Sequence, residues 1–239
     1  MKLSVIIPVY NDVNSLKVAI QKSIEELSQL AIPFEIIIVE DASTDGSYEI
    51  ALESSYRDHR IHLNHSDIRR GKGGALMDGI CQARGSIIIF YDVDLSTDLS
   101  SLKNMIILIQ SCDIVVGSRM LKESKVDRSG KRDISSKSFN FLVRTLLGST
   151  IQDHQCGFKA FNKTTLDKLL PYVHSRGWMW DTETLVVAQK CHCSIVEIPV
   201  IWKEGKDTKL RIRDIFAMAL SLIRFTWKIR IKRDYYKCN

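Results

Sequence analysis

Two carboxylates stand directly after an apolar run that has the length and composition of a buried strand. The run covers Ser86–Tyr91, and Asp92 and Asp94 follow it in the tripeptide Asp92-Val93-Asp94. Alternating side chains on an extended chain point both carboxylates to the same side. Two hard oxygen ligands placed there suit Mg²⁺ or Mn²⁺ held against a diphosphate. The sequence therefore predicts a metal-dependent reaction centre at Asp92 and Asp94.

The elements that must position this centre alternate between strand-like and helix-like segments. Strands are expected at Leu3–Val9, Phe34–Val39, Ile61–Asn64, Ser86–Tyr91 and Ile114–Gly117. Helices are expected near residues 14–30, 45–56, 73–84, 98–111 and 139–147. Continuous Val/Ile runs that alternate with helices predict an α/β fold, with a mainly parallel sheet flanked by helices. The charged, aperiodic segment 118–138 predicts a mobile loop over the rim of the sheet.

Acidic side chains follow three of the expected strands. Asp12 follows the first strand, Glu40 and Asp41 end the second, and Asp92 and Asp94 follow the fourth. In doubly wound sheets, ligands bind beyond the carboxyl ends of the strands. These carboxylates are therefore expected to converge on one rim, which is where a ligand would bind.

Length and composition limit the class of protein. With 239 residues, 45% of them hydrophobic, the chain can fill one α/β domain. The N-terminus does not resemble a signal peptide, and no apolar stretch approaches the roughly 18 residues that span a bilayer. A cytoplasmic protein is therefore expected. The six cysteines lack framework spacing and are expected to be free thiols, and Cys191-His192-Cys193 has no second pair to complete a zinc site.

The net charge of +6 is concentrated at the C-terminal end. Residues 202–239 carry eleven Lys/Arg and four Asp/Glu, a local charge of +7 against −1 for the rest. This imbalance indicates an anionic partner at that end. Nucleic acid is not the expected partner, because the basic residues interleave with aliphatic ones and form no known reader motif.

A basic amphipathic helix is expected from residue 210 onward, so that residues 1–209 form the main domain and 210–239 the helix and tail. Its apolar face would contain Ile212, Ile215, Phe216, Ala219, Leu222, Ile223 and Trp227. Its polar face would contain Arg213, Asp214, Ser221, Arg224, Lys228 and Lys232. Such a helix can lie in an anionic membrane surface, or it can pack on its own domain or on a partner subunit.

Several motifs, in their order along the chain, resemble glycosyltransferase family 2. They are SVIIPVYND at 4–12, EIIIVEDASTDGS at 35–47, RRGKGGALMDGICQARG at 69–85 and FYDVDL at 90–95. Further motifs are similar to the polyprenyl-phosphate (dolichyl-phosphate) hexose synthases of that family: GSR at 117–119, QCGFKAF at 155–161, WMWDTE at 178–183 and KEGKDTKLRIRD at 203–214. QCGFK and WDTE most resemble the glucosyltransferase branch.

This resemblance implies a GT-A, Rossmann-like fold over residues 1–209 and an inverting, metal-dependent hexosyltransferase. The implied donor is a nucleotide sugar, UDP-glucose before GDP-mannose, and the implied acceptor is a dolichyl or undecaprenyl phosphate. The enzyme would be peripheral at the cytoplasmic face of a membrane, where an integral membrane partner would help it to bind. Two alternatives stay open. One is a family 2 transferase that acts on a sugar hydroxyl and needs a general base, and the other is an inactive membrane-surface binding module, which the intact Asp92 and Asp94 disfavour.

The resemblance also implies roles for individual residues. The catalytic residues would be Asp92, Asp94 and Arg119, with Mg²⁺ or Mn²⁺ bound by the two aspartates. The nucleotide sugar would contact Pro8, Tyr10, Asp12, Asp41, Lys72, Asp92, Trp180 and Asp181. The acceptor phosphate would contact Arg119, Arg128, Lys131, Arg132, Gln155, Lys159 and Lys209. A phosphate acceptor is already anionic at neutral pH, so no obligatory catalytic base is expected.

Overall fold

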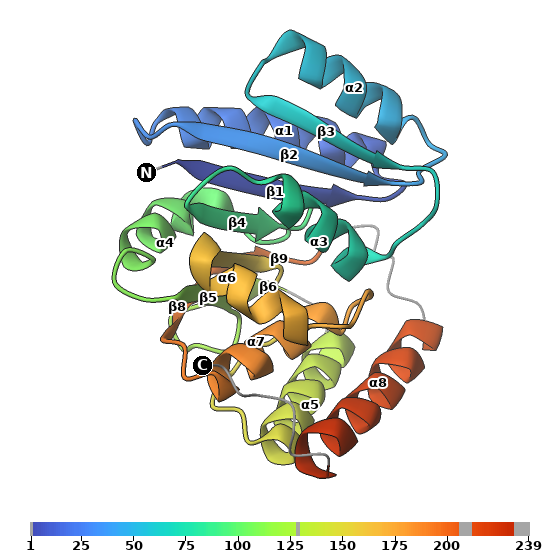
Figure 1. The fold of residues 1–239 in the computed structure, drawn as a ribbon, viewed down its shortest axis with the longest axis vertical. Helices are drawn as coiled ribbons and strands as arrows, with labels where there is room; N and C mark the ends of the chain where they lie inside the picture. Colours follow the sequence, from blue (N-terminus) through green and yellow to red (C-terminus); the bar gives the residue numbers. More distant parts are fainter. Residues whose placement is uncertain (1, 128–129, 206–211, 232–239) are drawn as a thin grey trace.

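The structure is a computed structural model that describes residues 2–127, 130–205 and 212–231, with side chains except at 130–132, 212–216 and 230–231. Its main sheet has seven strands in the order β3-β2-β1-β4-β7-β5-β8 (Figure 1). These strands are β1 (Leu3–Val9), β2 (Phe34–Asp41), β3 (Ile61–Ser66), β4 (Ile87–Tyr91), β5 (Ile114–Ser118), β7 (Phe158–Asn162) and β8 (Ile195–Pro199). β7 runs antiparallel to both of its neighbours, and the other pairings are parallel.

Helices cover both faces of this sheet, as the sequence predicts. One face packs against α1 (Val13–Ser28), α2 (Ser47–Arg57), the 3₁₀ turn η1 (Leu99–Ser101) and α4 (Leu102–Leu108). The other packs against α3 (Lys72–Gln82), α5 (Gly130–Leu147), α6 (Lys163–Leu169), the 3₁₀ turn η2 (Leu170–Tyr172), α7 (Trp180–Lys190) and α8 (Ile212–Ile231). β6 (Lys125–Asp127) and β9 (Ile201–Lys203) form a separate parallel pair. The expected mainly parallel α/β fold is confirmed.

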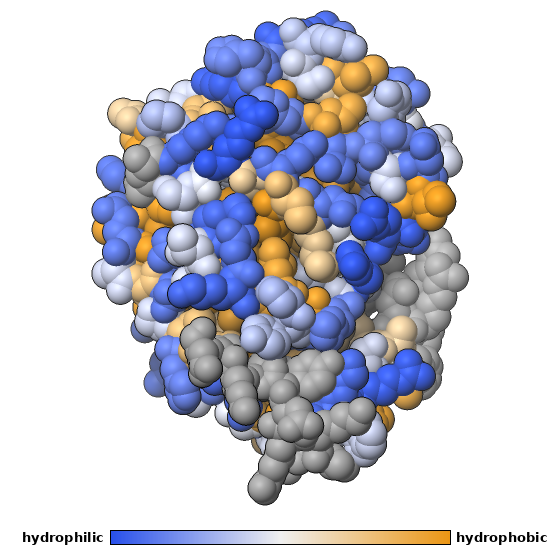
Figure 2. All heavy atoms as spheres, in the orientation of Figure 1, coloured by the Kyte–Doolittle hydropathy of each residue, from blue (hydrophilic) through white to orange (hydrophobic). Residues whose placement is uncertain are grey.

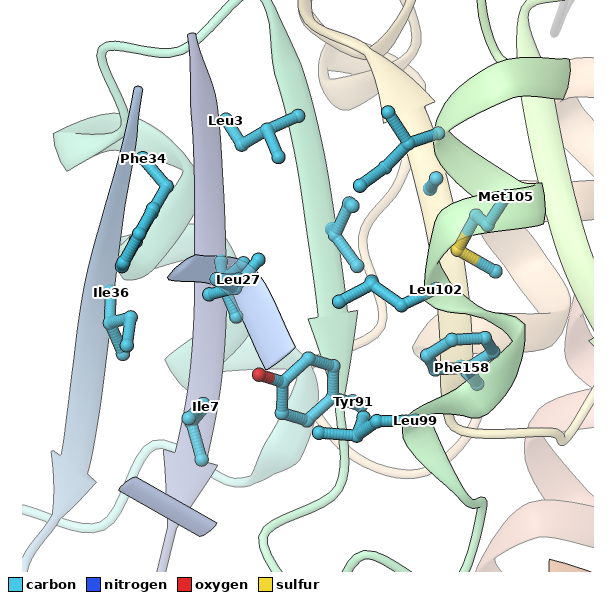
Figure 3. Close-up of a cluster of buried hydrophobic side chains, with 14 of the residues drawn as sticks. Leu3, Ile7, Leu27, Phe34, Ile36, Tyr91, Leu99, Leu102, Met105 and Phe158 are labelled. Atoms are coloured by element: carbon cyan, nitrogen blue, oxygen red, sulfur yellow. The ribbon is translucent and has the colours of Figure 1, made fainter. Parts of the chain in front are cut away.

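Strand periodicity divides the core into two layers. Along β1, Leu3 and Ile7 point to the face that holds α1 and α4, whereas Ile6 points to the face that holds α3. Figure 3 shows the first layer, where Tyr91 lies among aliphatic side chains from the strands and from α4. The Tyr91 hydroxyl donates to Ser23 Oγ at 2.6 Å, which satisfies a buried polar group and ties β4 to α1.

The structure differs from the expected elements after residue 118. The segment 118–138 is not one long loop, because β6 lies within it and α5 begins at Gly130 instead of Phe139. The helix therefore includes positions 131 and 132. β7 was not predicted, because Phe-Lys-Ala-Phe-Asn is short and contains a lysine, whereas the structure places it inside the sheet between β4 and β5.

The C-terminal helix α8 lies beside α5 at the end of the molecule away from β3 (Figure 1). Its buried side chains are Met218, Leu222 and Phe225, a face rotated from the predicted one. The predicted apolar residues Ile223 and Trp227 are exposed instead. Leu222 belongs to both faces, and Phe225, which faces the domain, was not part of the predicted apolar face. None of the helices in the described ranges has the length and hydropathy to cross a bilayer.

The surface in view is of mixed hydropathy, and four of the cysteines in the described ranges are free thiols. The face of the molecule in Figure 2 shows mostly hydrophilic residues with hydrophobic ones between them, as on an ordinary protein surface. Cys81, Cys112, Cys156 and Cys193 are free thiols, as expected. Cys191 is disulfide-bonded, so the expectation of six free thiols is wrong at this position.

The contribution of α4 to the core can be tested with a matched pair of substitutions. Leu102 is 1% exposed and packs on the sheet, whereas Ile107 in the same helix is 57% exposed. Leu102→Ala should lower the free energy of unfolding by about 2–5 kcal/mol, through lost burial and a cavity. Ile107→Ala should change it by less than about 0.5 kcal/mol. Urea unfolding followed by circular dichroism measures both, and equal effects would contradict this packing.

Candidate functional site

The carboxylate pair lies at the carboxyl end of β4, at the rim predicted from the sequence. The backbone N–H of Asp92 donates to Gly157 O, and that of Leu95 donates to Asp92 O at 3.1 Å. The second bond closes a turn, so the predicted extended chain is wrong here. Asp94 is exposed, and its carboxylate accepts hydrogen bonds from Ser96 N at 2.9 Å and Ser96 Oγ at 2.8 Å. The turn keeps both carboxylates at the rim.

Gly157 makes room for the Asp92 side chain. A Cβ built on residue 157 would overlap the Asp92 carboxylate, so no other amino acid fits here unless Asp92 moves. Gly157 precedes β7, which pairs with β4 and brings this backbone against the end of that strand. Gly157 therefore permits a close approach of this backbone to Asp92.

Asp92 lies in an unfavourable place for a negative charge. Burial raises its pKa above the ordinary value, the ammonium group of Lys72 opposes this, and the carboxylates of Asp94 and Asp181 raise it further. Asp94 contributes to this rise because its negative charge disfavours a second one on Asp92. Cations bound at this rim would relieve that repulsion.

Lys72 is the cation that the fold itself places there. It is the first residue of α3, and its ammonium lies 2.7 Å from Asp92 Oδ1 and 3.3 Å from Asp181 Oδ2. Burial alone lowers the pKa of Lys72, but Asp181 and Asp92 raise it above its usual value. A Cβ on Gly73 would lie 2.6 Å from Trp180 Cβ, so this glycine lets α3 approach α7. Lys72 therefore joins α3, α7 and the end of β4.

Asp181 and Lys159 continue this charged cluster into the core. Asp181 Oδ1 lies 2.5 Å from Lys159 Nζ, which also donates to Cys156 O. Lys159 has no exposed surface, so the prediction that it contacts the acceptor phosphate is wrong in this structure. Asp181 is almost fully buried between two ammonium groups. It forms an ion pair with Lys72, whereas the sequence predicted a contact with the sugar. Burial raises the pKa of Asp181, but Lys159 and Lys72 outweigh it and lower the pKa.

Two tryptophans of the WMWDTE motif have different environments. Trp180 is fully buried and packs edge to face against Phe90, so it belongs to the core and does not line a sugar pocket as predicted. Trp178 is 37% exposed, and the Lys72 ammonium lies 5.4 Å from its ring centroid. Trp178 is therefore the aromatic residue of this motif that faces the rim.

Asp41 holds the loop that precedes α3. Its two carboxylate oxygens accept hydrogen bonds from the backbone N–H groups of Arg70 at 2.6 Å and Gly71 at 2.9 Å. Gly71 has a φ of +77°, which glycine adopts without strain. Asp41 thus positions the glycine-rich segment, and its contact with base or ribose stays a prediction.

The remaining predicted donor residues lie at the ends of β1 and β2. Pro8 is half-buried in β1, opposite Val39. Asp12 precedes α1, and its backbone N–H donates to Ser47 Oγ. The guanidinium of Arg69 lies 3.8 Å above the Tyr10 ring, a stacking partner that the sequence reading did not foresee. The RRGKGG motif could have indicated it, since Arg69 directly precedes the loop that Asp41 holds.

Arg119 forms a buried ion pair with a residue that the sequence reading missed. Its Nε and Nη2 lie 2.7 and 2.8 Å from the two oxygens of Asp153, and its backbone N–H donates to the same carboxylate. Burial raises the pKa of Asp153, but Arg119 holds it well below the usual range. The Arg119 guanidinium also lies 5.5 Å from the Trp202 ring centroid. Asp153 stands two residues before Gln155, so an acidic residue just before the QCGFKAF motif was the available signal.

The other predicted acceptor residues are only partly described. Gln155 is half-buried, and its backbone N–H donates to Asp153. Positions 131 and 132 lie in the first turn of α5, but the side chains of Lys131 and Arg132 lie outside the described residues. Arg128 and Lys209 lie outside the described residues altogether.

A buried polar network fixes the loop that contains Asp153 and Gly157. His154 Nδ1 lies 2.9 Å from Asn140 Oδ1 of α5, and His154 Nε2 lies 2.8 Å from Ser149 Oγ. Ser149 also donates to Gln189 Oε1 of α7 at 2.9 Å. This network connects α5 and α7 to the loop on which Arg119 and Asp92 depend.

Comparison with known proteins identifies the family. A family model described as Glycosyl transferase family 2 matches residues 4–170. The chain belongs to glycosyl transferase family 2. It is 37% identical to Glycosyltransferase AglD of Haloferax volcanii over 97% of this chain, although it spans only 38% of that protein. It is 32% identical to the dolichyl-phosphate beta-glucosyltransferase of Saccharomyces cerevisiae, over 99% of this chain and 78% of that protein.

A solved structure shares the fold of this family 2 chain. It is the crystal structure of glucosyl-3-phosphoglycerate synthase from Mycobacterium tuberculosis in complex with Mn²⁺, uridine diphosphate and glucosyl-3-phosphoglycerate. The two match with a TM-score of 0.67, over 97% of this chain and 80% of that one, at 17% identity. At this identity the likeness shows the fold alone, which is the GT-A fold expected from the sequence.

The donor atoms at the rim fit the divalent ion implied by a GT-A fold. Among the described residues, no group of three or more His, Cys, Asp or Glu side chains is placed to hold a metal. Mg²⁺ is commonly held by one or two carboxylates, with substrate phosphates and water completing its coordination. Asp92 and Asp94 supply such a pair, and their mutual repulsion favours a cation. The residues therefore fit an ion that arrives with a diphosphate.

The requirement for glycine at position 157 gives a test of this geometry. Gly157→Ala should displace the Asp92 carboxylate and lower transferase activity about 100-fold, as expected for a misplacement of about 1 Å at a reacting centre. Gly177→Ala is the matched control, because a Cβ there meets nothing within 4 Å. Initial rates with radiolabelled donor measure both variants. Full activity in Gly157→Ala would show that Asp92 is not needed in this position.

The His154 network predicts a pH dependence of stability. Burial lowers the pKa of His154 to about 4, and Lys159 and Arg144 contribute while Asp153 opposes. The unfolded chain has a histidine pKa of about 6.5, so between these values it binds a proton that the folded chain does not. The free energy of unfolding should therefore fall as the pH falls, by on the order of 1–2 kcal/mol at pH 5 from this group.

This pH effect is measured by urea unfolding at pH 7, 6 and 5. His154→Gln should show a smaller loss between pH 7 and 5 than the wild type. His59→Gln removes an exposed histidine and should retain the wild-type dependence. Identical slopes in wild type and His154→Gln would exclude His154 as the source.

Proposed function

We propose that this chain transfers glucose, with inversion, from UDP-glucose to a polyprenyl phosphate such as dolichyl phosphate. The observation that carries the proposal is the match, over almost the whole chain, to the dolichyl-phosphate beta-glucosyltransferase of yeast. The site supports it. Gly157 of the QCGFK motif makes room for the Asp92 carboxylate, and Asp181 of the WDTE motif forms an ion pair with Lys72. Both subgroup motifs therefore contact the reaction centre. GDP-mannose is the second donor to test.

On the donor side, the chain supplies an aromatic face, a glycine-rich loop and a cation. The stacked side chains of Tyr10 and Arg69 would flank the base near the ends of β1 and β3, with Pro8, Asp12 and Asp41 around it. The loop held by Asp41 leads into α3, whose N-terminal end favours negative charge. Lys72 stands at that end and would contact the diphosphate.

At the reaction centre, Asp92 and Asp94 would hold Mg²⁺ or Mn²⁺, which when bound neutralises the departing nucleoside diphosphate. The bond between the anomeric carbon and the donor phosphate oxygen breaks as an oxygen of the acceptor phosphate bonds to the opposite face of that carbon. The products are the polyprenyl phosphosugar and the nucleoside diphosphate. The acceptor oxygen is already ionised, so no side chain has to remove a proton.

On the acceptor side, Arg119 would meet the incoming phosphate. Asp153 fixes its guanidinium through Nε and Nη2, which leaves the Nη1 hydrogens without a partner among the described residues. A pre-oriented guanidinium loses little entropy on binding a phosphate. Gln155 lies beside it in sequence on the half-buried loop. Arg128, Lys131, Arg132 and Lys209 stay proposed contacts of the same phosphate.

We also propose that residues 1–209 form the catalytic domain and that the helix after them faces the lipid. On α8, the exposed residues Leu220, Ile223 and Trp227 lie near Arg224 and Lys228 in the helix. Exposed apolar side chains with neighbouring cations suit an anionic membrane surface, where a polyprenyl phosphate displays its head group. We include in this proposal peripheral binding at the cytoplasmic face of a membrane, which an integral membrane partner would strengthen.

The proposal is tested by incubating the protein with Mg²⁺ or Mn²⁺, a short polyprenyl phosphate and radiolabelled UDP-glucose or GDP-mannose. Label should enter the organic phase from UDP-glucose, and Asp94→Asn should reduce this rate by about 100-fold or more, since it removes a metal-binding charge. Ser96→Ala, which removes only a hydrogen bond to Asp94, is the milder control. Donor hydrolysis without labelled lipid would overturn the acceptor and favour a hydroxyl acceptor.

A further inference from the structure

The position of Lys72 raises a conflict with a divalent ion at the same carboxylate. Its ammonium lies 2.7 Å from Asp92 Oδ1, which is ion-pair distance, and its side chain is only 10% exposed. An ion held by Asp92 and Asp94 would bring two positive charges to within a few ångströms of this ammonium. The two cations therefore compete for one carboxylate.

The fold gives Lys72 a second carboxylate to which it can move. Asp181 Oδ2 lies 3.3 Å from the Lys72 ammonium, slightly farther than Asp92. Lys159 anchors Asp181 from the opposite side at 2.5 Å, and both residues are buried. Asp181 is thus a fixed counter-ion, whereas Asp92 is at the open rim with 37% of its side chain exposed. Lys72 therefore lies between Asp181, which stays in position, and Asp92, whose carboxylate an incoming ion can bind.

We propose that Lys72 occupies the metal carboxylate Asp92 until the divalent ion arrives, and is then displaced toward Asp181 and the donor diphosphate. This inference rests on the proposed metal site at Asp92 and Asp94. It gives Lys72 two successive partners, first Asp92 and then the diphosphate, and so links ion binding to donor binding. When the ion binds Asp92, Lys72 loses this carboxylate as a partner, and the diphosphate becomes its new anionic partner.

Two consequences follow for binding. The ion alone binds weakly, because it must displace a cation that the site already holds. The nucleoside diphosphate then tightens ion binding, and by reciprocity the ion tightens nucleotide binding by the same factor. A lysine that merely braced Asp92 would have the opposite effect, since its removal would weaken ion binding.

The test measures Mn²⁺ binding by electron paramagnetic resonance of the free ion, with and without uridine diphosphate, at constant pH. Lys72→Met removes the cation and keeps the length of the side chain, and Lys72→Arg keeps the cation. Without nucleotide, Lys72→Met should bind Mn²⁺ about tenfold more tightly than the wild type, and Lys72→Arg within about twofold of it. The tightening by uridine diphosphate should be about tenfold smaller in Lys72→Met.

A second measurement follows the lysine itself and needs no substitution at position 72. Trp178 lies 5.4 Å from the ammonium, so movement of Lys72 changes the environment of this indole. Mg²⁺, which does not quench by paramagnetism, should produce a saturable change in tryptophan emission in the wild type. The change should be absent in Trp178→Phe, which retains the other three tryptophans.

The outcomes separate this inference from the proposed function. Unchanged or weaker Mn²⁺ binding in Lys72→Met, or an emission that Mg²⁺ leaves unaltered while it binds, overturns the displacement of Lys72 and leaves the transferase proposal standing. Asp94→Asn should lose Mn²⁺ binding in both nucleotide states. If it binds Mn²⁺ as tightly as the wild type, the metal site is wrong and the inference falls with it.

Discussion

A series of alternating charges that runs from the core to the rim organises the site: Lys159, Asp181, Lys72 and Asp92 contact one another in that order. Each comes from a different element, namely β7, α7, α3 and the end of β4. Ionised groups inside a protein are stable only when each one has a partner of opposite sign. Loss of any member would leave its neighbour charged and uncompensated, so the four elements must keep their mutual positions. This series of charges begins at Lys159 in the core and ends at Asp92 on the rim, where ligands can reach it.

Around this series of charges, close approaches of the backbone bring the elements together. Gly73 lets α3 approach α7, and Gly157 lets the strand β7 arrive against Asp92. Asp41 and Asp153 act in a similar way through side chains, since each carboxylate binds the backbone of a neighbouring loop. All four residues act on the positions of other groups. They determine where Lys72, Asp92 and Arg119 can be.

Much of the fold was predictable because hydrophobic burial leaves a strong pattern. The Val/Ile runs of β1 and β4 are buried on both faces, and their bounds differed from prediction by one residue at most. The rim carboxylates were predictable for the same reason, since they stand where such a run stops. β7 was not predictable in this way, because Lys159 in a strand reads as a surface residue until its partner Asp181 is known. Partners that are distant in sequence, as in Arg119 with Asp153, carry no local pattern.

The antiparallel strand β7 has a consequence for how the protein is made. It lies between β4 and β5 in the sheet, yet it follows both of them along the chain. Chains fold as they emerge from the ribosome, N-terminal part first. Until residue 162 has been synthesised, one edge of β4 has no neighbour, and its Ile-rich backbone is available to other chains. The nascent protein therefore passes through a stage in which its own central strand is the surface most prone to aggregation.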